Sequence, residues 1–161
     1  MTVRMGVKAL IVDPIANMPV VILRDDAEKN LLPIWVGIFE ANAIALQMEG
    51  VTTPRPMTHD LLKSVIEKVQ GGVVRIVINA LEENTFYAQI HLRVANRELL
   101  VDSRPSDAIA LALRTNAPVF VEEEVLEKSR HHDETPDGQN SARLRKWLEE
   151  VDPDSLGKYK M

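Results

Sequence analysis

The stretch "VDSRPSDAIALALR", Val101–Arg114, places charged and polar residues directly before an apolar run. Because Pro105 disfavours the α conformation at Arg104, we expect a helix that begins either with Pro105 as its first residue or with Ser106 as its N-cap. Asp107 then lies in the first turn, where its negative charge suits the helix dipole. The run that follows is apolar on every face, which predicts a helix that is buried on all sides.

The pattern around this stretch predicts strands that alternate with helices. Apolar runs and alternations bounded by turn residues indicate strands at Val3–Val12, Pro19–Leu23, Leu31–Val36, Val73–Leu81, Thr85–Val94, Glu98–Val101 and within Ala117–Val121. The expected helices are Ile38–Met48, Asp60–Val69, the helix from Pro105, an acidic helix within Glu122–Ser129, and Ala142–Glu150. The predicted fold class is therefore α+β, with a mixed, mainly antiparallel sheet and Ala-rich helices.

A short repeat indicates two related units. Ala43–Leu46 and Ala108–Leu111 both read AIAL, and the same offset aligns Ile34–Val36 with Leu99–Val101. Each copy predicts a strand, a short turn and an Ala-rich helix, so we hypothesise two related strand-strand-strand-helix units. Four shared helix-forming residues also arise by chance, and this alternative stays open.

The chain is expected to form one core domain followed by a tail, because 161 residues that are 45% hydrophobic suffice for one well-buried core. We expect this domain over residues 1–130, a mobile polar loop over residues 131–140, and a C-terminal helix and tail over residues 141–161. One stripe of the last helix is apolar, so we expect the helix to dock on the core or on a neighbouring subunit. The stripe consists of Leu144, Trp147, Leu148 and Val151.

Composition excludes several classes of protein. No apolar stretch approaches the roughly 20 residues that span a bilayer, and the N-terminus lacks a signal layout, so we expect a soluble, cytoplasmic protein with no membrane partner. The absence of cysteine excludes thiolate nucleophiles and zinc–thiolate sites. A formal net charge of -5 means that nucleic acid would have to bind through a local basic patch. Aromatic residues make up only 4% of the chain, which argues against a protein that stacks many bases.

Polar residues beside two predicted helix starts indicate a site. An arginine near a helix N-terminus suits a phosphate group, and a nearby carboxylate can hold a divalent cation. The stretch "PRPMTHDLL", residues 54–62, has the same ingredients as the opening stretch, with Thr58 as the expected N-cap. If the two helix starts meet, they gather residues suited to metal-assisted phosphodiester hydrolysis, namely Arg55, His59, Asp60, Asp102, Arg104 and Asp107.

Three motifs, "GIFEANAIAL", "PRPMTHDLL" and "VDSRPSDAIALALR", in this order and spacing resemble the bifunctional nuclease domain family. The resemblance covers roughly Val3–Ser129, and the closing "LGKYKM" resembles bacterial members. It implies an α+β fold, a homo-oligomer, and degradation of both DNA and RNA, as a plant member of the family degrades them. Among homo-oligomers, we expect a dimer. The residues at the family's motif positions are Glu40, Arg55, Thr58, His59, Asp60, Asp102, Arg104, Ser106 and Asp107.

We therefore hypothesise a metal-dependent nuclease. Asp102 and Asp107, together with Glu40, would bind Mg²⁺ or Mn²⁺ through carboxylate oxygens, which are the ligands that these hard cations prefer.

Four further residues are catalytic candidates. His59 would act as a general base toward water. Arg55 and Arg104 would bind the phosphate and stabilise the charge of the transition state. Asp60 is the fourth catalytic candidate. Thr58 and Ser106 would cap their helices.

Each assignment has a structural alternative. His59 can be a surface or capping residue, and arginines bridge carboxylates more often than phosphates. If Arg104 pairs with Asp60 or Glu40, the cluster is a buried polar lock between helix starts. The alternative function is a non-catalytic oligomeric module that binds a phosphorylated ligand or acts structurally.

Two other histidine segments carry less weight. Adjacent residues in a flexible loop seldom form a coordination geometry, so we interpret the run His131–Glu134 as solvated loop. His91 is expected at the surface or at an interface.

Overall fold

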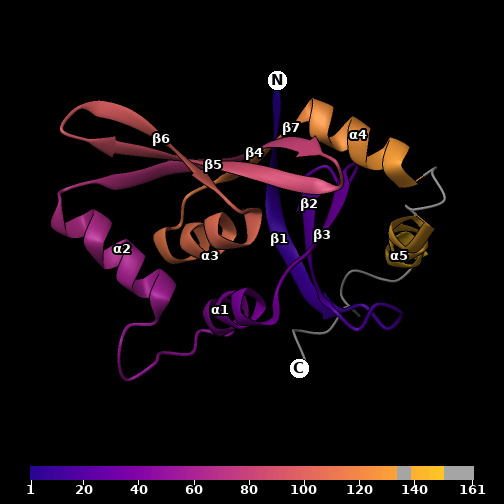
Figure 1. Cartoon of the computed structure of the whole chain (residues 1–161), viewed down its shortest axis with the longest axis horizontal. Helices are drawn as coiled ribbons and strands as arrows, with labels where there is room; N and C mark the ends of the chain where they lie inside the picture. The colour runs from indigo at the N-terminus through magenta and orange to yellow at the C-terminus, as the bar shows by residue number, and fades with distance from the viewer. Residues whose placement is uncertain (134–138, 151–161) are drawn as a thin grey trace.

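A computed structural model describes residues 1–133 and 139–150, and these residues form one seven-stranded sheet with helices packed around it (Figure 1). The strands are β1 (Thr2–Val12), β2 (Pro19–Asp25), β3 (Leu31–Trp35), β4 (Gly72–Glu82), β5 (Thr85–Val94), β6 (Arg97–Ser103) and β7 (Val119–Glu122). Their order is β3-β2-β1-β7-β4-β5-β6. All neighbouring strands are antiparallel except β4 and β7. The predicted α+β class and mainly antiparallel sheet are confirmed.

The helices lie in two groups. They are α1 (Ile38–Met48), α2 (Thr58–Lys68), α3 (Pro105–Thr115), α4 (Glu123–Asp133) and α5 (Gln139–Glu150). In Figure 1, α1, α2 and α3 lie together on one side of the sheet, whereas α4 and α5 lie at the other end of the molecule. Both α1 and α2 pack against α3, so α3 is the centre of its group.

The predicted repeat is visible in the topology. β1, β2 and β3 pair in sequence and lead into α1, and β4, β5 and β6 pair in sequence and lead into α3. β7 separates the two units, antiparallel to β1 and parallel to β4, so β1 and β4 run in opposite directions. The chain therefore contains two strand-strand-strand-helix units of the same connectivity.

The buried helix predicted from the opening stretch is confirmed, since residues 108–112 are at most 2% exposed. Of the two predicted starts, the one with Pro105 as the first helical residue is correct. Arg104 is the N-cap, in an extended conformation that Pro105 imposes on it. Ser106 lies inside the first turn, so its predicted role as the cap is wrong.

The start of α2 also differs from the prediction. Thr58 is the first helical residue, and Met57 is the N-cap. The Met57 backbone N–H donates to the Asp60 carboxylate at 3.0 Å. Because a side chain inside the helix satisfies the end of α2, Thr58 does not act as a cap.

One face of α2 is apolar, as its periodicity indicates, but most of that face is exposed. The exposed residues are Leu61, Leu62, Val65 and Val69, which are 38% to 58% exposed. Ile66 is buried in the main core, and His59 is also buried. Periodicity reveals a face of a helix, not whether another element covers it.

The C-terminal region is more helical than predicted. α4 continues through Asp133 and α5 begins at Gln139, so the predicted loop over residues 131–140 is wrong at both ends. Residues 134–138, with Glu134 of the histidine run, and residues 151–161 lie outside the described residues. Leu144 and Leu148 are buried in a second core cluster with Val20, which confirms that this helix docks on the core. In the described part of the chain, no helix is long and apolar enough to cross a membrane.

Arg114 ties the three helices of the first group together. Its side chain is only 4% exposed, and Nε donates to Asp60 Oδ1 on α2 at 2.7 Å. Nη1 donates to the Ala110 carbonyl within α3, and Nη2 donates to the Ala43 carbonyl on α1, each at 2.9 Å. The guanidinium is therefore a buried clamp between α1, α2 and α3.

Removal of the Asp60 carboxylate should destabilise this clamp. We expect Asp60→Ala to lower the free energy of unfolding by about 3 kcal/mol near neutral pH, because the buried Arg114 charge loses its counter-ion. The Met57 N–H, and then Arg114, hold the pKa of Asp60 below its ordinary 3.8 against the effect of burial. The stabilisation is therefore complete above pH 3.8 and is lost as the pH falls through the lowered pKa.

Urea denaturation between pH 7 and pH 2.5 measures this difference, which should shrink in acid. Lys63→Ala is the control, since Lys63 makes only an exposed pair with Glu67 on the same helix and should change stability by less than about 0.5 kcal/mol. Equal stability of Asp60→Ala and the wild type at pH 7 would show that Arg114 is not a clamp.

Candidate functional site

The first turns of α1, α2 and α3 meet at a charged cluster centred on Asp107. Asp107 Oδ1 lies 2.8 Å from His59 Nε2, and Oδ2 accepts a hydrogen bond from Arg104 Nε at 2.8 Å. Arg104 Nη2 lies 2.8 Å from Glu40 Oε1. We call Glu40, His59, Arg104 and Asp107 the Asp107 cluster. Each helix of the group contributes to it.

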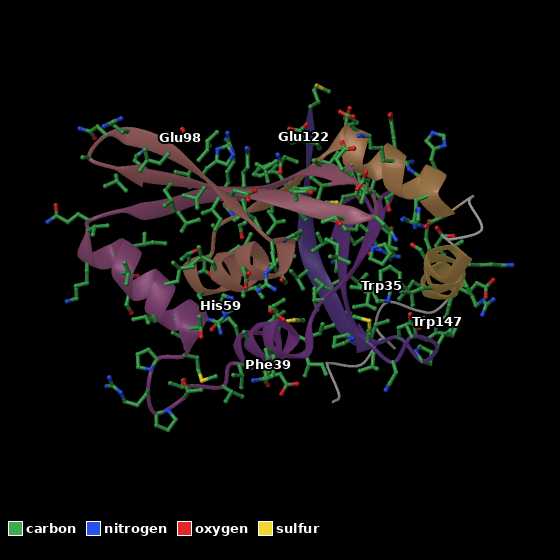
Figure 2. The ribbon with its side chains drawn as sticks, viewed as in Figure 1. Trp35, Phe39, His59, Glu98, Glu122 and Trp147 are labelled. Atoms are coloured by element: carbon green, nitrogen blue, oxygen red, sulfur yellow. The ribbon has the colours of Figure 1, made fainter. Side chains whose placement is uncertain are left out.

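Exposure changes steeply across the Asp107 cluster. The His59 side chain is 11% exposed and lies between α2 and α3 (Figure 2), whereas the Arg104 side chain is 65% exposed. Asp107 lies between these extremes and contacts both. A ligand from solvent would therefore meet the Arg104 guanidinium first, with the imidazole behind it.

Asp107 remains a carboxylate at neutral pH. Burial raises the pKa of Asp107, but hydrogen bonds from Arg104 and His59 outweigh burial and hold the pKa below its usual value. The hydrogen bond to Asp107, and then the bond to Glu40, raise the pKa of Arg104. An ionised carboxylate only accepts hydrogen bonds, so Nε2 of His59 carries the proton. In the neutral ring, Nδ1 is then the basic nitrogen.

The structure brings together four of the residues predicted for the site, and it separates the others. Asp60 pairs with Arg114 at the other end of α3 from Asp107. Arg55 is exposed in the loop before α2, where its carbonyl accepts a bond from the Thr53 hydroxyl at 2.7 Å. Ser106 is buried in the first turn of α3.

Asp102 lies on the opposite face of the sheet from the Asp107 cluster. It pairs with Gln89 on β5, whose neighbours Ala88 and Ile90 are buried in the core with α3. Because successive side chains of a strand point to opposite faces, Gln89 and Asp102 point away from α3. Asp102 and Asp107 are only five positions apart in the sequence, but the strand's alternation separates them.

The three expected metal ligands do not form a set. Asp102 lies on the other face, and the Arg104 guanidinium binds both Glu40 and Asp107. Among residues 1–133 and 139–150, no group of three or more acidic or histidine side chains could hold a metal ion. In this arrangement the Glu40 and Asp107 carboxylates already have a cationic partner, so they do not fit a divalent cation as well as they fit Arg104.

Two residues of this region were not predicted as part of it. Gly37, the N-cap of α1, lies against the Glu40 carboxylate, and a Cβ at this position would collide with Oε2. Glycine therefore allows Glu40 to fold back toward Arg104. Arg114 ends the apolar run of the opening stretch, and only its burial shows its role.

The other histidines lie elsewhere. His91 on β5 is buried, and its Nδ1 lies 3.0 Å from Glu98 Oε1, so the first of its two expected positions, the surface, is wrong, and the second, an interface, stays a prediction. His131 and His132 belong to α4, and the neighbouring Asp133 pairs with Arg145.

Comparison with known proteins identifies the family of this chain. A model of the bifunctional nuclease domain matches residues 21–134. An uncharacterized protein of Mycobacterium tuberculosis is 38% identical over 149 residues, which cover 87% of this chain and 89% of that protein.

Two plant relatives carry a functional name. Bifunctional nuclease 1 of Arabidopsis thaliana is 32% identical over 111 residues, or 66% of this chain, and Bifunctional nuclease 1 of Oryza sativa subsp. indica is 28% identical over 113 residues, or 68%. The matched part is 34% of each plant protein, so this chain spans about a third of their length. The family resemblance of the three motifs is confirmed, and this chain belongs to the bifunctional nuclease domain family.

Proposed function

We propose that this chain hydrolyses phosphodiester bonds of DNA or RNA at the Asp107 cluster. The observation that carries the proposal is the single carboxylate of Asp107, which contacts a buried histidine and an exposed arginine at 2.8 Å each. A general base and a phosphate-binding cation are two groups that accelerate such hydrolysis. The names of the plant relatives support nuclease activity, although they share only part of their length with this chain.

Each member of the Asp107 cluster has a role in this proposal. Arg104 binds a non-bridging phosphate oxygen and offsets the charge that develops there. His59 Nδ1 accepts a proton from the attacking water as its oxygen bonds to phosphorus. The ester P–O bond breaks, the leaving oxygen takes a proton from solvent water, and the His59 imidazolium then returns its proton to solvent, so the net reaction consumes one water molecule. Asp107 fixes the His59 ring and stabilises the imidazolium, while Glu40 holds Arg104 in position.

The expected requirement for Mg²⁺ or Mn²⁺ stays a separate proposal. Arg104 neutralises Glu40 and Asp107 in the described arrangement, so a metal ion would need different ligands or a displaced Arg104. A further phosphate contact from Arg55 is likewise a prediction, since its loop adjoins the start of α2.

One observation favours a second candidate, a non-catalytic oligomeric module that binds a phosphorylated ligand. The exposed apolar residues of α2 form a surface that a second copy of this chain could cover, and neighbouring copies often bury such patches. This candidate requires Arg104 for binding but does not require His59. The two candidates therefore separate when cleavage is measured.

Removal of the general base should abolish cleavage. We expect His59→Ala and Asp107→Asn to lower the cleavage rate at least about 100-fold, because each removes proton transfer or the group that orients it. The assay uses end-labelled single-stranded DNA, duplex DNA and RNA, each with Mg²⁺, with Mn²⁺ or with EDTA. Circular dichroism verifies that each variant is folded.

The matched control is His91→Ala, because His91 is equally buried and is also paired with a carboxylate, but lies outside the Asp107 cluster. It should cleave at the wild-type rate. Equal cleavage by the wild type and His59→Ala would indicate a contaminating nuclease and contradict the proposal. Phosphate binding without any cleavage would favour the oligomeric module.

The position of Glu40 can be tested through Gly37. In Gly37→Ala the new methyl group displaces the flexible end of Glu40, so the fold should persist while Glu40 loses its bond to Arg104. We expect the cleavage rate to fall about tenfold, as it should in Glu40→Gln, because Arg104 loses one charged hydrogen bond that positions it.

Gly6→Ala is the control for this test, since a Cβ at Gly6 meets nothing within 4 Å. Thermal melts report the stability of all three variants. Wild-type cleavage by a folded Gly37→Ala, together with a loss in Glu40→Gln, would show that Gly37 does not control the position of Glu40.

A further inference from the structure

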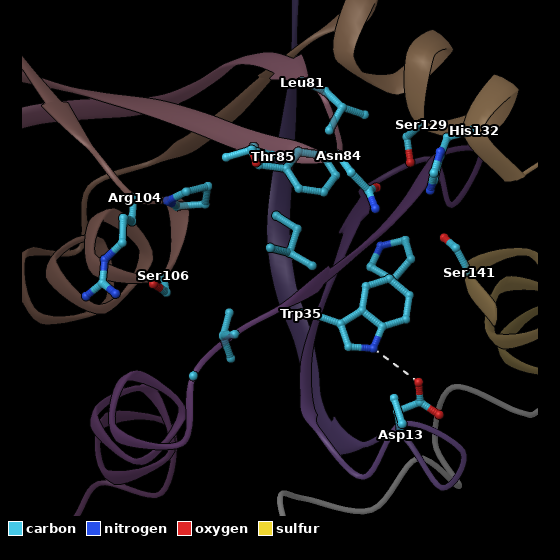
Figure 3. A pocket seen from close by; sticks show the side chains of 17 residues that line it. Asp13, Trp35, Leu81, Asn84, Thr85, Arg104, Ser106, Ser129, His132 and Ser141 are labelled. Atoms are coloured by element: carbon cyan, nitrogen blue, oxygen red, sulfur yellow. Dashed lines mark hydrogen bonds between the residues drawn. The ribbon is translucent and has the colours of Figure 1, made fainter. Parts of the chain in front are cut away.

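A cavity of about 470 Å³ opens beside the Asp107 cluster and reaches across to the C-terminal helices. Arg104 and Ser106 line one end, and Ser129 and Ser141 line the other (Figure 3). Its volume lies in the range of small-molecule sites in proteins, which is about 300 to 1,000 Å³. The cavity therefore connects the exposed arginine to a space large enough for a small organic ligand.

Aromatic side chains form part of the cavity wall. Trp35, the last residue of β3, projects into the centre of the view in Figure 3, and Phe86 on β5 also lines the space. The indole Nε1 of Trp35 donates to Asp13 Oδ2 at 3.1 Å, and Asp13 is only 2% exposed. Because this hydrogen bond fixes the indole ring, its flat face is a preformed surface for a flat aromatic ligand.

Polar groups stand across the cavity from Asp13. Figure 3 shows the Asn84 amide and Thr85 on the opposite side of Trp35 from Asp13. Asn84 lies in the turn between β4 and β5, and Thr85 is the first residue of β5; both line the cavity. An amide and a hydroxyl provide donors and acceptors for the edge of a heterocyclic ring. The cavity wall is therefore apolar at the aromatic rings of Trp35 and Phe86, and it offers hydrogen-bonding groups at Asn84 and Thr85.

The end of the cavity at α3 suits an anion. Backbone N–H groups in the first turn of a helix have no partner within the helix, and Arg104 adds a cationic side chain beside them. Ser106 is 6% exposed and lines the same end of the cavity. A serine hydroxyl can donate one hydrogen bond and accept others, so Ser106 adds a short polar group beside Arg104.

We propose that this cavity binds the base and sugar of the nucleotide whose phosphate lies at Arg104. The base stacks on Trp35, with Asn84 and Thr85 at its edge, and Ser106 and the first turn of α3 contact the sugar-phosphate end. The inference rests on the proposed function only for the position of the phosphate. Its test measures binding and needs no cleavage.

The binding test uses a protein with Trp35 as its single tryptophan. Trp147→Phe removes the second tryptophan of the chain, which is 46% exposed on α5 and does not line the cavity. Adenosine monophosphate, ribose 5-phosphate and inorganic phosphate are titrated, with Trp35 fluorescence and calorimetry as readouts. Adenosine monophosphate should quench Trp35 saturably and bind at least about tenfold more tightly than ribose 5-phosphate, since only the former can stack.

Two variants separate the base end from the phosphate end. In the Trp147→Phe background, Arg104→Ala should weaken binding of both adenosine monophosphate and ribose 5-phosphate. Trp35→Leu should weaken adenosine monophosphate about tenfold and leave ribose 5-phosphate unchanged, as measured by calorimetry. Phe86→Leu provides a second test of the aromatic wall should Trp35→Leu fail to fold, and the Trp147→Phe protein without a further substitution is the control.

The outcomes distinguish this inference from the proposed function. Equal affinity for adenosine monophosphate and ribose 5-phosphate, or unaltered Trp35 fluorescence, would overturn the base site even if the protein cleaves nucleic acid. Tight, Trp35-dependent binding of adenosine monophosphate by a protein that cleaves nothing would support the base site and overturn the proposed nuclease.

Discussion

The burial of α3 is the constraint on which the rest of the structure depends. Its residues 108–112 are at most 2% exposed, so the charged groups of this helix must lie at its ends. Charged groups beside a core need partners, and both ends of α3 take them from the same two helices. At one end Arg114 reaches Asp60 on α2 and a carbonyl on α1. At the other end Asp107 contacts His59 on α2, and Arg104 contacts Glu40 on α1.

The two ends of α3 differ in exposure: the buried end stabilises the fold, and the exposed end is accessible to a ligand. The Arg114 side chain is 4% exposed, and its hydrogen bonds join α3 to both α1 and α2, so it acts as a clamp. The Arg104 side chain is 65% exposed and stands at the mouth of a cavity. The two-unit topology explains the position of that cavity, because the links from β3 to α1 and from β6 to α3 both line it. The pairing of Arg104 with Glu40 that the polar lock requires is present, but Arg104 is largely exposed, so this pair is not a buried lock. The buried lock lies instead at Arg114, which the sequence analysis did not consider.

The strands and helices of the core could be predicted from the sequence because proline, glycine and apolar periodicity mark them locally. The predictions that Thr58 and Ser106 cap their helices were wrong. The free backbone groups at a helix end can be satisfied by a side chain within the helix or by a tertiary contact, which local sequence does not reveal. The prediction that Asp102 lies beside Asp107 was wrong, because the position of Asp102 depends on which face of β6 its side chain occupies. The clamp at Arg114 could not be foreseen, as nothing in an apolar run tells which of its flanking charges will be buried.

The central claim is that a phosphodiester binds against the Arg104 and His59 side of α3, and the ring nitrogens of His59 report on it most directly. The chain has four histidines, and His91 has the same burial and a similar carboxylate partner. In protein with isotope-labelled histidine nitrogens, a dinucleotide with a cleavage-resistant phosphorothioate link is titrated and followed by nuclear magnetic resonance. The account predicts that the His59 nitrogen resonances shift saturably while those of His91 stay unchanged. Saturable binding that leaves His59 unaffected, or that shifts His59 and His91 alike, would contradict it.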